Sequence, residues 1–126
     1  MGRASRTGRG AKVVLAGIVL AAGAACGGQP SSKREVQHVA QVAIDTYGCG
    51  SCHTIPGIRG ADGLVGPPLT RFYERPYIAG QLPNTPEDLV RWIMHPQEVA
   101  PGTAMPDLDV TEEDARAIAD FLLAPQ

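Results

Sequence analysis

The sequence predicts an all-α domain of three to four helices joined by long loops, and three observations lead to this fold class. Three segments, which begin at Ser32, Thr85 and Thr111, combine a helix-start signal with apolar residues at helical spacing. Residues 54–83 keep no helical or strand period. No segment has a convincing alternation of apolar and polar residues, which a half-buried strand would show.

The first predicted helix starts at Ser32-Lys33-Arg34-Glu35, which fits a capping box. One apolar face then follows at positions i, i+3, i+4, i+7, i+8 and i+11, formed by Val36, Val39, Ala40, Ala43, Ile44 and Tyr47. Gly48 can adopt the left-handed conformation that commonly ends a helix. We therefore expect a helix of about four turns that leads directly into Cys49.

Two further helices have equally clear starts. Thr85–Asp88 supplies an N-cap, a proline at the first helical position and two acids at the positive end of the helix dipole, and the helix should end before Pro96. Thr111–Asp114 repeats the pattern, with Val110 placed to pack on Ala115. The apolar faces are Leu89, Trp92 and Ile93 in one helix, and Ile118, Phe121 and Leu122 in the other.

The segment between the first two helices is broken by glycines at 57, 60, 63, 66 and 80 and by prolines at 56, 67, 68, 76 and 83. A stretch of about 30 residues without regular structure is unusual in a small compact domain. We therefore expect this loop to wrap a large cofactor that replaces part of the peptide core. The residues expected in the pocket or core are Leu64, Val65, Leu69, Phe72, Leu89, Ile93, Ile118 and Leu122.

Residues 1–25 have the composition of an export signal. Three arginines and a lysine precede an uncharged apolar run at residues 13–25. This run is shorter than the ~20 residues that cross a bilayer, but its length is typical of the apolar part of a signal peptide. Removal of residues 1–25 would leave 7 basic and 13 acidic residues, a formal net charge of −6. This charge argues against nucleic acid as a partner.

Cys26 follows the apolar run directly and precedes a stretch rich in glycine, proline and serine. We therefore expect residues 26–34 to form a flexible tether and residues 35–126 to form the folded domain. The arrangement resembles a bacterial lipoprotein signal, which implies cleavage before Cys26 and its lipidation, although Gly23 stands where such signals usually carry leucine. Cleavage after Ala22-Gly23-Ala24 and an uncleaved anchor are the alternatives. The expected location is the periplasm or the outer face of the cytoplasmic membrane.

The segment CGSCH at residues 49–53 has three candidate roles: a redox dithiol, half of a zinc site, or a covalent haem attachment. Thioredoxin-type dithiols occur near a βαβ pattern, which is missing here, and closed zinc sites need four ligands, for which His38 and His95 have no suitable spacing. Cys-x-x-Cys-His is the attachment signature of c-type haem. Cys49 and Cys52 would bond to the two vinyl groups, and His53 would then reach the iron. One covalent haem c is therefore the predicted cofactor.

Four segments together resemble a small bacterial class I c-type cytochrome: CGSCH, GPPL at 66–69, HPQEVAPGTAMPDL at 95–108, and the closing helix with its acidic start. The resemblance covers about residues 35–124. It implies a class I cytochrome c-like fold, in which the helices and long loops surround one covalently bound haem.

The second axial ligand is expected to be Met105. Met1 leaves with the signal, and Met94 lies in a helix beside Trp92 and Ile93, where methionine usually fills gaps in the core. Met105 lies instead between Pro101-Gly102-Thr103 and Pro106, whose rigid turns would hold its sulfur in place. The family also places its ligand methionine at this point. We expect His38 and His95 to be solvated.

The resemblance implies further contacts around the haem. In the family the first proline of G-P-x-L accepts a hydrogen bond from the proximal imidazole, which assigns this role to Pro67. In the family the haem propionates are bound by an arginine a few residues later and by aromatic hydrogen-bond donors. The resemblance assigns the first role to Arg75 and the second to Tyr77 and Trp92. The alternative for Arg75 is an ordinary exposed side chain. Trp92 stands where larger mitochondrial-type members usually carry a tyrosine near the methionine.

A haem iron with both axial positions filled has no open site for a small-molecule substrate. This favours an electron carrier in a respiratory chain rather than an enzyme, with redox proteins as donor and acceptor. The acidic charge favours a basic or mainly apolar partner surface. Two alternatives stay open: a haem enzyme or gas sensor with a displaceable methionine, and a fixed haem subunit of an oxidase or dehydrogenase complex.

Overall fold

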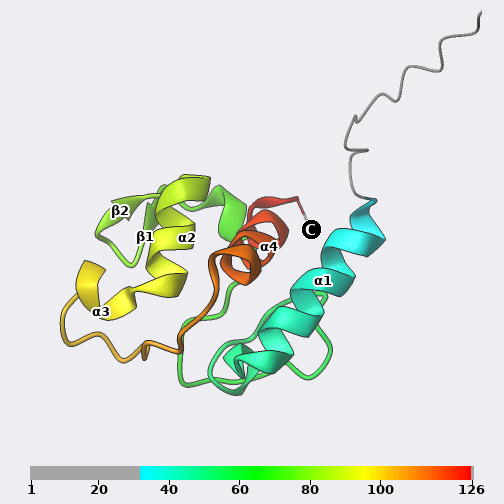
Figure 1. Ribbon diagram of the computed structural model, residues 1–126, viewed down its shortest axis with the longest axis horizontal. Coiled ribbons are helices and arrows are strands. Elements are labelled where there is room, and N and C mark those ends of the chain that lie inside the picture. Colours follow the sequence, from blue (N-terminus) through cyan, green and yellow to red (C-terminus); the bar gives the residue numbers. More distant parts are fainter. Residues whose placement is uncertain (1–31, 126) are drawn as a thin grey trace, which may run out of the picture.

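The computed structural model describes residues 32–125 and is mostly helical (Figure 1). The predicted signal, Cys26 and most of the predicted tether lie outside the described residues. The elements in chain order are α1 (Lys33–Thr46), the 3-10 helices η1 (Cys49–Ser51) and η2 (Phe72–Glu74), strands β1 (Tyr77–Ile78) and β2 (Leu82–Pro83), and helices α2 (Pro86–Met94), α3 (Pro96–Val99) and α4 (Glu112–Leu123). The all-α prediction with long loops is confirmed.

Each of the three predicted helix starts is capped in the structure. The hydroxyl oxygens of Ser32, Thr85 and Thr111 accept hydrogen bonds from the amide N–H three residues later in α1, α2 and α4. At Ser32 the cap closes onto Glu35 at 3.3 Å. Because α1 already begins at Lys33, the last two residues assigned to the tether are helical.

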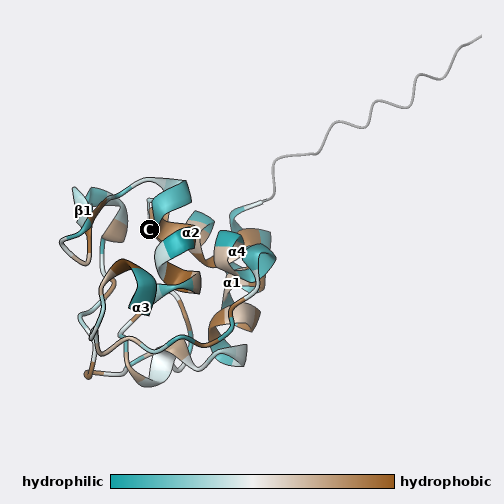
Figure 2. Cartoon of the chain, turned by 60° about the vertical axis from the view of Figure 1, so that its left-hand side comes forward, coloured by the Kyte–Doolittle hydropathy of each residue, from teal (hydrophilic) through white to brown (hydrophobic). Residues whose placement is uncertain are grey.

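The core forms where α4 packs against both α1 and α2 (Figure 1). Figure 2 shows hydrophobic and hydrophilic residues on each of these helices, as amphipathic packing requires. Small residues let α1 and α4 approach, since Ala40, Ala43, Ala115 and Ala119 are all at most 2% exposed. The other buried members include Ile44, Ile55, Ile58, Phe72, Ile78, Leu89, Ile93, Val110, Ile118, Phe121 and Leu122.

Three of the residues expected inside the molecule are exposed. Val39 is 46% exposed, because α1 turns only the Ala40, Ala43 and Ile44 side of its apolar face toward α4. Leu64 and Val65 are 89% and 81% exposed, so they do not belong to the protein core, and their expected place in the cofactor pocket stays a prediction. The other predicted core residues are buried or, for Val36, Tyr47, Leu69 and Trp92, partly buried against the core.

The β1–β2 hairpin, the short helix α3 and the two 3-10 helices were not predicted. The strands pair antiparallel, with Tyr77 opposite Pro83 and Ile78 opposite Leu82. Ala79 and Gly80 both have positive φ, 50° and 69°, in the turn between them. Such a turn favours glycine or asparagine, so an alanine there conceals the hairpin in the sequence.

None of the helices within residues 32–125 is long and apolar enough to span a membrane.

Candidate functional site

The turn η1 brings both cysteines of the CGSCH segment into one turn of chain. Gly48 has a positive φ of 67° directly after α1 and redirects the chain. The amide N–H groups of Cys52 and His53 then donate to the carbonyl oxygen of Cys49, at 3.2 and 3.0 Å. Cys49 and Cys52 are free thiols and each is half-buried. The segment therefore offers two unpaired sulfurs and an imidazole within five residues.

The environment of the first thiol argues against a redox dithiol. Burial is the main cause that raises the pKa of Cys49 above its ordinary value, and the nearby Cys52 adds to the increase, against a backbone hydrogen bond that lowers it. A reactive cysteine needs the opposite shift, because the thiolate is the nucleophile. The prediction that CGSCH is not a thioredoxin-type motif agrees with this environment.

The loop after the motif folds back over it, and glycines allow the close approach. Gly63 N–H donates to the carbonyl oxygen of Gly50 at 3.0 Å. A Cβ on Gly50 would lie 2.8 Å from Cα of Ala61, and one on Gly63 would lie 2.6 Å from the carbonyl carbon of Cys52. The Thr54 hydroxyl also donates to the Gly63 carbonyl oxygen at 3.0 Å. Side chains are excluded at these two positions because backbone packs against backbone.

The ring of His53 is held on two sides by the GPPL segment. Its Nδ1 lies 2.8 Å from the carbonyl oxygen of Pro67. Gly66 packs against the ring, since a Cβ there would lie 2.7 Å from Nδ1. Gly66 N–H also donates to the carbonyl oxygen of Cys52 at 2.7 Å. The structure thus contains the contact that the family resemblance implied for Pro67.

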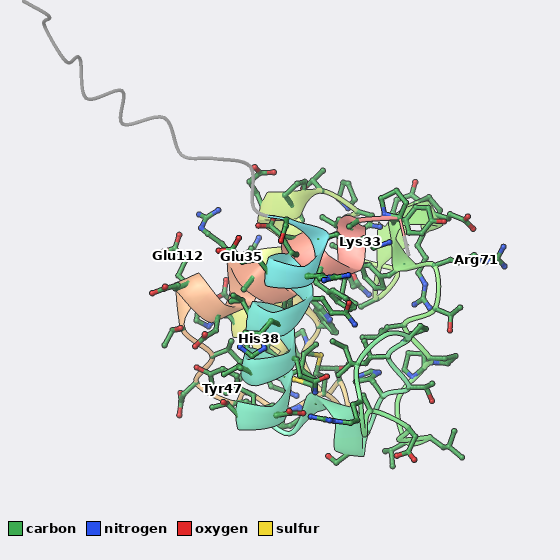
Figure 3. The ribbon with its side chains drawn as sticks, turned by 90° about the vertical axis from the view of Figure 1, so that its right-hand side faces the viewer. Lys33, Glu35, His38, Tyr47, Arg71 and Glu112 are labelled. Atoms are coloured by element: carbon green, nitrogen blue, oxygen red, sulfur yellow. The ribbon has the colours of Figure 1, made fainter. Side chains whose placement is uncertain are left out.

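Arg75 is tied to the same segment. Its guanidinium donates to the carbonyl oxygen of Pro68, one residue after the group that accepts from His53. The guanidinium carbon also lies 5.0 Å above the centre of the Phe72 ring, a cation–π distance. Asn84 holds the base of this turn, because its amide donates to the carbonyl oxygens of Phe72 and Arg75, each at 2.9 Å. Arg75 is half-buried, whereas Arg71 is exposed, pairs with Glu74 at 3.5 Å and points away from the molecule in Figure 3.

Met105 lies half-buried in the irregular loop between α3 and α4. The side chain of Gln97 crosses to this loop and donates to the carbonyl oxygens of Thr103 and Met105, at 2.7 and 2.8 Å. Gln97 was not singled out in the sequence, because its partners lie six and eight residues away in a loop without any period. In Figure 1 this loop and the loop after η1 lie on the same lower side of the molecule.

The remaining predicted residues differ in their surroundings. Trp92 and Met94 pack against the core, which agrees with the gap-filling role expected for Met94. Tyr77 is 61% exposed. His38 and His95 are exposed as expected, and Figure 3 shows His38 on the outward side of α1.

These groups fit a covalently attached haem better than a metal ion alone. Within residues 32–125 no three His, Cys, Asp or Glu side chains gather as metal ligands would. The thiols are unpaired, and the Pro67 carbonyl, which can only accept, fixes the proton of His53 on Nδ1. Nε2 then keeps its lone pair, and no hydrogen bond to it is found in the described part of the chain. A c-type haem needs this set of two thiols and one available imidazole nitrogen.

Comparison with known proteins agrees with the site. The family model described as cytochrome c matches residues 36–125. The chain is 40% identical over 110 residues to cytochrome c55X of Paracoccus denitrificans, which covers 84% of this chain and 88% of that protein. It is also 41% identical over 75 residues to cytochrome c oxidase subunit 2 of Alkalihalophilus pseudofirmus, covering 59% of this chain and 21% of the subunit.

A second cytochrome c oxidase subunit 2, from Bacillus sp. strain PS3, is 33% identical over 86 residues, which are 65% of this chain and 24% of that protein. The chain thus spans only about a fifth to a quarter of the length of these two subunits. No solved structure matches it significantly. The match to the family covers nearly all of the described residues, so the chain belongs to the cytochrome c family, carries covalently bound haem c and takes part in haem-based electron transfer.

Proposed function

We propose that this chain is a single-haem electron carrier in which Cys49 and Cys52 form the thioether bonds and His53 and Met105 are the axial ligands. The observation that carries the proposal is the 2.8 Å contact between His53 Nδ1 and the Pro67 carbonyl oxygen. It sets the tautomer and the orientation of the ring, which is what a ligand histidine requires. Gly66, packed against the ring, limits any other orientation.

When bound, the haem iron supplies a one-electron couple between the ferric and ferrous states. An imidazole–thioether ligand pair stabilises the ferrous state and raises the reduction potential. The ligands come from two separate loops, each fixed by hydrogen bonds to side chains or backbone. Such ligands need little rearrangement when the charge of the iron changes, which suits a carrier.

Arg75 is the proposed cation for the haem propionates. One of its N–H groups is used on Pro68, and a guanidinium has five donors, so others stay available. The exposed Tyr77 hydroxyl and the half-buried Trp92 indole are proposed as further donors, and no hydrogen bond from either is found in residues 32–125.

The proposed setting is a respiratory chain outside the cytoplasmic membrane, with lipidated Cys26 as the anchor and redox proteins as donor and acceptor. The basic, then apolar, composition of residues 1–25 supports export. The similarity to two cytochrome c oxidase subunits favours a second candidate, a haem domain fixed in a larger complex. Both candidates use the same ligands.

The test is the absorption spectrum of the haem-loaded protein, oxidised and reduced, for the wild type and for Met105→Ala. We expect a low-spin wild type with the weak far-red band of a sulfur–iron bond, and loss of that band in Met105→Ala. Met94→Leu is the matched control, because Met94 packs against the core and should keep the band. A high-spin wild type that binds carbon monoxide readily would contradict the proposal and favour a haem enzyme or gas sensor.

A further inference from the structure

The side chain of Gln97 makes hydrogen bonds to three backbone groups in the loop that contains Met105. Gln97 Nε2 donates to the carbonyl oxygens of Thr103 and Met105, at 2.7 and 2.8 Å. On the other side of the same amide, Oε1 accepts from the N–H of Gly102 at 3.2 Å. Three backbone groups within four residues therefore depend on a single amide.

The loop has few hydrogen bonds of its own. Thr103 N–H donates to the Ala100 carbonyl oxygen at 3.0 Å, and Met105 N–H reaches the Thr103 hydroxyl only at 3.5 Å. Within the described chain, no backbone–backbone hydrogen bond involves residues 104–110. Without the Gln97 side chain, the loop around Met105 would be held by the Thr103–Ala100 bond, by two long contacts of 3.5 Å and by the flanking prolines. The long contacts run from Met105 N–H to the Thr103 hydroxyl and from Gln97 N–H to an oxygen of the Asp107 carboxylate.

Gln97 lies on a short helix that is anchored in the core. It is half-buried and belongs to α3, whose first residue, Pro96, is among the largest fully buried side chains. Ala100 N–H closes the short helix onto the Pro96 carbonyl oxygen at 2.9 Å. An ion pair between Arg91 and Glu98, 2.8 Å long, joins α3 to α2, although both groups are exposed and the pair adds little stability. The three hydrogen bonds of the Gln97 side chain, called the clamp below, therefore tie the Met105 loop to a helix that is anchored in the core.

We propose that Gln97 is a positioning residue that keeps the Met105 sulfur in place and sets how readily this ligand leaves the iron. The inference rests on the proposed His53/Met105 ligation. A ligand loop opens when its hydrogen bonds break, so the three bonds of Gln97 directly oppose opening. Their loss increases the fraction of protein whose sixth position is open to a competing ligand.

The test is a titration of the ferric haem protein with imidazole, in which loss of the far-red sulfur–iron band measures displacement of Met105. Three hydrogen bonds of ordinary net strength correspond to an increase in apparent imidazole affinity of about tenfold to a thousandfold in Gln97→Ala. Gln97→Glu keeps the acceptor for Gly102 but turns an oxygen toward two carbonyl oxygens, so its affinity should rise at least as much. Gln81→Ala, in the exposed turn between β1 and β2, should bind imidazole like the wild type.

The outcomes separate the two proposals. A wild type without the band contradicts the ligation itself. A wild type with the band, together with Gln97 variants of unchanged imidazole affinity, overturns the role of Gln97 alone. A residue with only a structural role would lower the unfolding midpoint and leave the imidazole affinity unchanged.

A measurement on the wild type keeps the inference testable if the variants do not mature. Hydrogen exchange of the Gly102 N–H, which is bonded to Gln97, should become faster when imidazole saturates the haem. Unchanged exchange would refute the clamp, because Met105 would then leave without disturbing the bonds of Gln97.

Discussion

The packing of Gly66 against the His53 ring leads to a quantitative prediction for Gly66→Ala. An added Cβ would lie 2.7 Å from Nδ1 and 2.9 Å from Nε2 of the imidazole, closer than carbon and nitrogen atoms can approach. The backbone at Gly66 is not in the left-handed region, so the effect of the substitution is steric. Either the ring or the loop must move.

The magnitude follows from two losses. Overpacking of this kind costs about 1–3 kcal/mol, and the displaced Gly66 N–H would weaken its 2.7 Å hydrogen bond to the Cys52 carbonyl oxygen, at a cost of about 0.5–1.5 kcal/mol. Together these losses amount to about 1.5–4.5 kcal/mol. With a guanidinium m-value of roughly 4 kcal/mol/M, they lower the unfolding midpoint by about 0.4–1.1 M. We also expect weaker low-spin character, because His53 is no longer held in position.

The assay is guanidinium unfolding of the haem-loaded protein, followed by the haem absorption and by circular dichroism. Gly80→Ala is the control, because Gly80 has a positive φ of 69° but open space around its Cα. Its cost should be the backbone strain of about 1–2 kcal/mol, with an unchanged haem spectrum. A wild-type midpoint and spectrum for Gly66→Ala would refute the argument from close packing.

Two further predictions concern the acidic start of α4 and the N-terminus. Hydrogen bonds from the hydroxyl of Thr111, the larger cause, and from that of Tyr47 lower the pKa of Asp114 below its ordinary value of 3.8. The ionised Asp114 therefore contributes its full stability above pH 3.8, and this stability is lost as the pH falls through the lowered pKa of the native state. Asp114→Asn should therefore show a smaller loss of stability between about pH 5 and pH 2, and an equal loss in both proteins would contradict this. For Cys26, N-terminal mass analysis before and after lipase should reveal an acyl chain in the wild type and none in Cys26→Ser, and a wild type without an acyl chain would exclude the lipoprotein.

Local signals made the three longer helices, α1, α2 and α4, predictable. Ser32, Thr85 and Thr111 each cap the helix that was expected from them, because an N-cap bonds to an amide only three residues away. The haem motif is equally local, since CGSCH places two thiols and an imidazole within one turn regardless of the rest of the fold. The Pro67 contact was implied by family resemblance, and the structure contains it.

Other features depend on contacts that no sequence window contains. The exposure of Val39 follows from how α4 lies across α1, and the exposure of Leu64 and Val65 follows from how their loop folds back over the motif. A hydrophobic residue in a loop has no period that reveals which side faces the core. The β1–β2 hairpin was missed for a related reason, because a two-residue strand is too short to show alternation.

The sequence by itself determined α1, α2 and α4, the motif and the candidate ligands, because each of these depends on residues within a few positions of one another. The tertiary structure decided how the ligands are supported: Gly66 against His53, and Gln97 across to the loop of Met105. These contacts join irregular segments through space, and their energy exists only once the chain has closed the intervening loops. A glutamine or a glycine in such a place has no local signature, so its role becomes visible only in the folded molecule.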